Sequence, residues 1–145
     1  MCWNPWRRRL PKPPIGQLQV CAPCTHPDRE KRGPVRAGEL FASRLATEVA
    51  ARPELAALRV VAAPCIGNCA ARCRVSFAGP GRWSWLIGGL DPGAPTDGLL
   101  DFARRWLEAP DGFVGKDDRP KPIRPLLLGR VPPPELAEFR EPSTG

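Results

Sequence analysis

Cysteines are the residues of this 145-residue chain whose type and spacing could do chemistry. Five of the six fall into two short clusters, Cys21-Ala-Pro-Cys24 and Cys65-Ile-Gly-Asn-Cys69-Ala-Ala-Arg-Cys73. The chain has a single histidine, so thiolates are the main soft ligands that it can offer. Two clusters of this kind predict zinc, an iron–sulfur cluster or a redox-active thiol pair.

The spacing of the second cluster favours iron and sulfide over zinc. Zinc ribbons typically use two Cys-x2-Cys pairs, whereas three residues separate Cys65 from Cys69. Gly67 between them allows the backbone to turn tightly and to direct its N–H groups towards sulfur. Zinc stays open as the alternative cofactor of a metal carrier or adaptor without a redox role.

A thiol–disulfide oxidoreductase that uses Cys21 and Cys24 is the second alternative. The tetrapeptide Cys-Ala-Pro-Cys resembles the active site of thioredoxins, in which a helix N-terminus stabilises the first thiolate. In this chain polar residues follow Cys24, and helical periodicity begins only after Arg36. We therefore expect the thiolate to lack that helix, which argues against this alternative.

The elements that must position the two clusters can be predicted from apolar periodicity. Residues 58–63 are β-branched and apolar, as in a buried strand, and Phe41, Leu45 and Val49 repeat at helical spacing. The predicted elements are a strand over 17–20, a helix over 37–52, strands over 58–63, 74–78 and 83–88, and a helix that begins near residue 97 and ends before Pro110.

This order, β-α-β-β-β-α, predicts an α/β fold with a mixed sheet and helices packed against it. Both cysteine clusters follow a predicted strand, so they should meet where neighbouring strands end. The composition divides the chain into a basic Pro-rich arm over 1–16, a domain over 17–112 and a Pro-rich tail over 113–145. The apolar run at 126–128 predicts that the tail is partly docked on the domain.

The charge of the chain limits its partners. The net charge is +7, and residues 1–36 hold eight Lys or Arg against two acids, whereas residues 37–112 are balanced. A neutral folded domain argues against a nucleic-acid partner, which usually meets basic residues spread over a folded face. No apolar run approaches the roughly 18 residues of a membrane span, and no signal-peptide pattern is present, so we expect a cytoplasmic protein without a membrane partner.

The second cluster, Cys-Ile-Gly-Asn-Cys, resembles the Cys-Leu-Gly-x-Cys element of thioredoxin-like [2Fe–2S] ferredoxins. This group includes the small iron–sulfur subunit of respiratory NADH dehydrogenases. The two clusters, the Trp83-Ser-Trp85 strand, Gly112, Arg119-Pro120 and Arg130-Val-Pro-Pro133 occur in an order that resembles a bacterial family of predicted metal-binding proteins of unknown function. The resemblance covers roughly residues 17–134, and members of that family are often associated with cobalamin-synthesis loci.

The resemblance implies a thioredoxin-like ferredoxin fold and a [2Fe–2S] cluster. It also implies a one-electron carrier rather than an enzyme, in a cobalamin-related pathway. By matching, the ligand role falls to Cys21, Cys24, Cys65 and Cys69, with Cys73 as a substitute for one of them. Cys73 stands about where those ferredoxins carry a proline.

Basic residues predict how the carrier would meet its redox partner. The loop that contains Arg29, Lys31, Arg32 and Arg36 should dock on an acidic surface of a partner protein, and a homodimer stays open. Arg72 and Arg74 flank Cys73 and are expected at a solvated strand end. If one of them instead lay near the cluster, its charge would raise the reduction potential.

Overall fold

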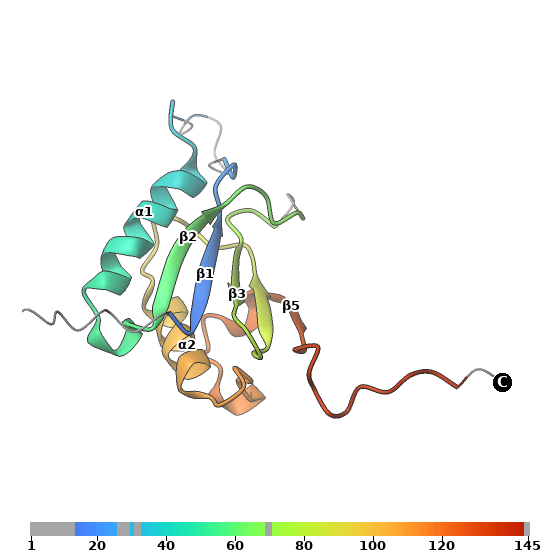
Figure 1. Cartoon of the computed structure of the whole chain (residues 1–145). Coiled ribbons are helices and arrows are strands. Elements are labelled where there is room, and N and C mark those ends of the chain that lie inside the picture. Colours follow the sequence, from blue (N-terminus) through green and yellow to red (C-terminus); the bar gives the residue numbers. More distant parts are fainter. Residues whose placement is uncertain (1–13, 26–29, 31–32, 69–70, 144–145) are drawn as a thin grey trace, which may run out of the picture.

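The computed structural model describes residues 14–25, 30, 33–68 and 71–143 of the chain. Its elements follow the predicted order, with one further strand near the C-terminus (Figure 1). The predicted α/β class with a mixed sheet is confirmed. The elements are β1 (Gly16–Cys21), α1 (Ala37–Ala50), β2 (Leu58–Ala63), β3 (Val75–Ala78), β4 (Ser84–Ile87), α2 (Asp97–Glu108) and β5 (Leu127–Val131).

The five strands form one sheet in the order β2-β1-β3-β4-β5. β1 and β2 are parallel, which requires a crossover connection that α1 supplies, and the other neighbours are antiparallel. The last residue of β1, Cys21, pairs with Ala63, the last of β2, and Val20 pairs with Val75 at the start of β3. The C-terminal ends of β1 and β2 and the N-terminal end of β3 therefore lie side by side, at the same end of the strands.

One face of the sheet carries the core. Residues that alternate along the strands align across β1, β3 and β4, because Leu18 pairs with Phe77 and Phe77 with Trp85. The opposite face presents the partly buried polar residues Gln17, Gln19 and Ser76. Both helices contribute side chains to the same apolar core. These are Phe41, Ala42, Leu45 and Val49 from α1 and Leu99, Leu100, Phe102, Ala103 and Trp106 from α2.

Aromatic rings fill the centre of this core. Phe77 lies 5.4 Å from Phe102 and 5.5 Å from Trp106 between ring centroids, in tilted arrangements typical of buried aromatic pairs. Trp85 and Trp106 are buried, whereas Trp83 is only partly buried and packs edge-on against Phe113. The rings thus join α2 to the middle of the sheet.

The tail contributes a strand that the sequence pattern did not indicate. β5 pairs with β4 through Arg130 opposite Trp85 and Gly129 opposite Leu86, and it forms one edge of the sheet. Val114 and Ile123, on the way to β5, are buried in the core. Residues 1–13 of the N-terminal arm lie outside the described residues.

In the part of the chain that the structure describes, no helix is long and apolar enough to cross a bilayer.

Candidate functional site

Three thiols from the two clusters come together at the C-terminal end of β1. Cys21 is the last residue of β1, Cys24 lies in the turn that follows, and Cys73 stands just before β3. All three are buried and form one small cluster against which Ile66 and Leu90 pack. The sulfur atoms of Cys24 and Cys73 are 3.7 Å apart. The two clusters thus meet through Cys73, which precedes β3, rather than through the cysteines that follow β2 directly.

A further predicted ligand, Cys65, lies in the loop that follows β2. Cys65 is exposed, and the backbone N–H of Gly67 donates to its sulfur at 3.4 Å. Gly67 has a φ of +81°, so the prediction that this glycine allows a tight turn towards sulfur is confirmed. Cys69 lies outside the described residues, and within the described ranges no three Cys, His, Asp or Glu side chains are arranged to hold a metal ion. The ligand set stays a prediction.

Cys73 takes a more central place than the sequence assigned to it. Its backbone N–H donates to the Cys24 sulfur at 2.9 Å, and its φ of +49° is uncommon for a residue other than glycine. The Leu90 N–H donates to the Cys73 carbonyl at 3.3 Å and helps to hold that backbone. Burial, and then the neighbouring Cys24, raise the pKa of the Cys73 thiol to about 12. Burial thus favours the neutral form of the Cys73 thiol, while the Cys73 backbone N–H donates to the sulfur of Cys24.

Arg74 is buried against the thiols, so the prediction that it lies at a solvated strand end is wrong. Only 2% of its surface is exposed, whereas Arg72 is exposed. One terminal nitrogen of Arg74 donates to the Cys21 sulfur at 3.1 Å, and the other donates to the carbonyl of Asn68 at 2.8 Å. Such contacts offset the cost of burying a guanidinium, because they replace part of its hydration. Arg74 also connects the first cysteine cluster to the loop of the second.

The start of α1 contacts the turn between Cys21 and Cys24. The Gly38 N–H donates to the Cys24 carbonyl at 2.9 Å, and Arg36 donates to the Pro23 carbonyl at 3.2 Å. The helix begins at Ala37, as the sequence predicts, and its first turn lies beside the first cluster. The contact is made to a carbonyl, and the hydrogen bond to the Cys24 sulfur comes from Cys73 instead.

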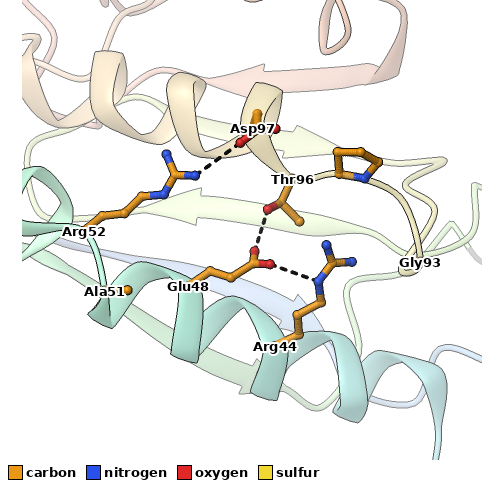
Figure 2. A pocket seen from close by; sticks show the side chains of 8 residues that line it. Arg44, Glu48, Ala51, Arg52, Gly93, Thr96 and Asp97 are labelled. Carbon is orange, nitrogen blue, oxygen red and sulfur yellow. Dashed lines mark hydrogen bonds and ion pairs between the residues drawn. The ribbon is translucent and has the colours of Figure 1, made fainter.

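A second concave region lies between α1 and the segment that leads into α2, but its polar groups are engaged with one another (Figure 2). Thr96 donates to a carboxylate oxygen of Glu48 at 2.5 Å, and Arg44 pairs with the other oxygen at 3.0 Å. Arg52 pairs with Asp97 at 3.3 Å. These contacts connect the two helices, and we assign the region a structural role.

The fold and the site together define a mixed α/β domain with a buried thiol cluster at the ends of the central strands of its sheet. The chain belongs to a family described as a protein of unknown function (DUF1636), whose model matches residues 18–133. No curated protein and no solved structure matches the chain. The matched region contains all five clustered cysteines together with β5.

Proposed function

We propose that the chain binds a [2Fe–2S] cluster through its clustered cysteines and acts as a ferredoxin-like one-electron carrier. The observation that carries the proposal is the set of N–H donors aimed at sulfur. The sulfur of Cys21 accepts from Arg74, that of Cys24 from the Cys73 backbone, and that of Cys65 from the Gly67 backbone. Such donors stabilise thiolates and tune the potential of metal-bound sulfur.

The donor set fits this cofactor. Thiolate sulfur is the ligand that iron–sulfur clusters prefer, and the buried Arg74 supplies a positive charge beside a site that gains negative charge. Cys21, Cys24, Cys65 and Cys69 would hold the iron atoms, with Cys73 in place of one of them. When bound, a [2Fe–2S] cluster supplies a one-electron couple. The chain's own part is to exclude water from Cys21, Cys24 and Cys73 and to direct N–H groups towards sulfur.

Two alternatives use the same residues. Four thiolates would also bind zinc, which gives a metal-binding module without a redox role. A thiol–disulfide function is favoured by one specific contact, the 3.7 Å between the sulfur atoms of Cys24 and Cys73. This contact shifts the candidate pair from Cys21–Cys24 to Cys24–Cys73.

One preparation separates the three functions. The full chain is purified without oxygen, and its visible absorption is recorded together with its iron, acid-labile sulfide and zinc content. We expect a coloured protein with two irons and two sulfides per chain. A colourless protein with one zinc would replace the proposal with the metal-binding module. A colourless protein without metal, in which added oxidised glutathione takes two electrons and leaves Cys24 and Cys73 joined as a disulfide, would replace it with the thiol function.

Single Cys→Ser variants identify the ligands. Iron retention is measured for variants at positions 21, 24, 65, 69 and 73, with Cys2→Ser in the N-terminal arm as the matched control. We expect four of the five variants to lose most of their iron. Full iron retention in Cys73→Ser would show that Cys73 is not a ligand. Full retention in Cys65→Ser or Cys69→Ser would show that the substituted cysteine is not a ligand and that Cys73 takes its place.

The partner that the proposal implies is a redox protein with an acidic docking surface. Arg36 is exposed beside the first cysteine cluster, where such a surface would approach, while Arg29, Lys31 and Arg32 lie outside the described residues. Association rates that fall steeply with ionic strength would support this docking. The place of the carrier in a cobalamin-related pathway is part of the proposal through the family resemblance alone.

A further inference from the structure

Three arginines of the Pro-rich segment lie near one another on the β4–β5 side of the sheet, away from the thiols. Arg119 and Arg124 precede β5, and Arg130 lies within it. Arg124 donates to the carbonyls of Arg119 at 3.0 Å and Asp117 at 3.4 Å, which fixes it beside Arg119. We name Arg119, Arg124 and Arg130 the arginine cluster.

Two guanidinium groups of this cluster lie over the same indole ring. The Cζ atoms of Arg119 and Arg130 are 5.1 Å and 5.7 Å from the centre of Trp85. Arg130 also lies 5.4 Å from the ring of Phe113. Aromatic rings attract the face of a guanidinium, so its N–H edges are left for planar acceptors.

Those edges are largely unused within the protein. Arg119 donates through Nε to the Val114 carbonyl at 3.1 Å, which leaves its terminal nitrogens for other acceptors. The guanidinium of Arg130 makes ring contacts and donates no hydrogen bond to the residues that the structure describes. The arginine cluster therefore presents several N–H donors without a protein acceptor, at a fixed position on the sheet.

The positive charges of the cluster are also not balanced. Among the described residues, none of its three guanidinium groups is within ion-pair distance of a carboxylate. On α2, in contrast, Arg104 and Arg105 both pair with Asp101. Burial lowers the pKa of Arg119, and the charges of Arg130 and Arg124 lower it further. Repulsion between neighbouring cations disfavours this arrangement unless an anion accompanies it.

We propose that the arginine cluster is a binding site for the oxyanion of a small ligand, either a phosphate or a carboxylate group. Arg119 and Arg130 offer the paired N–H geometry that binds such groups through two oxygens, and Arg124 adds a third positive charge. A role of the arginines as a cover for Trp85 does not account for Arg124, whose guanidinium donates to backbone carbonyls and, among the described residues, lies over no aromatic ring. The site is independent of the proposed cluster-binding function.

The test titrates the full chain with pyrophosphate and, separately, with citrate, at ionic strength matched with sodium chloride. Heat of binding and tryptophan fluorescence are recorded, since Trp83 and Trp85 lie beneath Arg130. We expect saturable binding of one ion per chain, and the preferred ion assigns the ligand as a phosphate or a carboxylate. Arg124→Gln should weaken binding about tenfold, which corresponds to one charge-assisted contact.

Two further variants keep the test decisive. Arg130→Lys retains the positive charge and loses the planar guanidinium that can donate two parallel hydrogen bonds, so it should also weaken binding. Arg59→Gln removes an exposed arginine on β2, at the opposite edge of the sheet, and should bind as the parent does. Binding of neither ion beyond the salt control, or equal binding by Arg124→Gln, Arg130→Lys and the parent, would overturn the proposal. A lower unfolding midpoint with unchanged affinity would assign the arginines to packing alone.

Discussion

Both ends of β3 carry a buried arginine, and the two residues have different partners. Arg74 precedes the strand and Arg82 follows it, with 2% and 8% of their surfaces exposed. Arg82 donates to the carbonyls of Ala109 at 2.7 Å and Leu107 at 3.3 Å, and to that of Trp106. These carbonyls belong to the C-terminal end of α2, where the helix dipole favours a cation. At that end of the strand, the charge of the arginine is offset by a permanent feature of the fold.

At the other end, Arg74 faces a group whose charge can change. It donates to loop carbonyls and to the sulfur of Cys21. A sulfur atom gains negative charge when the thiol ionises or binds metal, whereas a helix end keeps the same partial charge under all conditions. The comparison indicates that Arg82 serves the fold, while Arg74 serves both the fold and the thiol site.

The largest effect in this comparison is expected at Arg82. Arg82→Gln removes the charged donor from several α2 carbonyls and the guanidinium that lies 4.8 Å from the Trp106 ring. Because buried hydrogen bonds to a charged group are lost, the free energy of unfolding should fall by about 3 kcal/mol, measured by urea denaturation. Iron per folded chain should stay as in the parent. A loss below about 1 kcal/mol would contradict the role of Arg82 as a helix cap.

The next largest effect tests the contact between α1 and the cysteine turn. A Cβ at position 38 would lie 2.0 Å from the Cys21 carbonyl oxygen and 2.7 Å from that of Ala22. Both neighbours are backbone, so Gly38→Ala should cost about 2–3 kcal/mol of unfolding free energy and lower iron retention. Gly33→Ala is the matched control, because a Cβ there meets nothing within 4 Å. Equal stability of the two variants would show that the helix start does not hold the turn.

The order of elements could be predicted from the sequence because it depends on local patterns. The alternation in β1 and β3 and the helical spacing of Phe41, Leu45 and Val49 are visible in short stretches of chain. β5 is different. Its sequence Leu-Leu-Gly-Arg-Val contains a glycine and stands between proline-rich stretches, so its extended backbone depends on pairing with β4, some 40 residues away in the chain.

The site could be predicted in part for the same reason. Strand ends beside both cysteine clusters could be read from the sequence, but the contact between the clusters runs through Cys73 before β3, the antiparallel neighbour of β1. The burial of Arg74 does not follow from local sequence, because its acceptor Cys21 is 53 residues away. The central place of Cys73 depends on its positive φ. A positive φ is uncommon for residues other than glycine, so the residue type does not indicate it.

A third prediction separates Arg74 from its exposed neighbour Arg72. If the chain binds a [2Fe–2S] cluster, Arg74→Gln removes a positive charge 3.1 Å from the Cys21 sulfur. Reduction adds negative charge, so the loss should lower the midpoint potential, by on the order of 100 mV for a partly screened unit charge. Arg72→Gln is the control and should shift the potential far less, because its side chain is exposed. Equal midpoint potentials of the two variants would show that the charge of Arg74 does not influence the potential.

The smallest effect concerns the contact between Glu48 and Thr96, which is remote from the thiols (Figure 2). Thr96→Val removes the hydroxyl that donates to the Glu48 carboxylate and should lower the free energy of unfolding by about 1 kcal/mol. Thr47→Val, which removes an exposed hydroxyl bonded within α1, is the control and should change it by less than about 0.5 kcal/mol. If Thr96→Val also shifted the midpoint potential, the effect of Arg74→Gln would reflect general loosening of the domain. An unchanged potential in Thr96→Val would trace the effect of Arg74→Gln to the contact between its guanidinium and the sulfur.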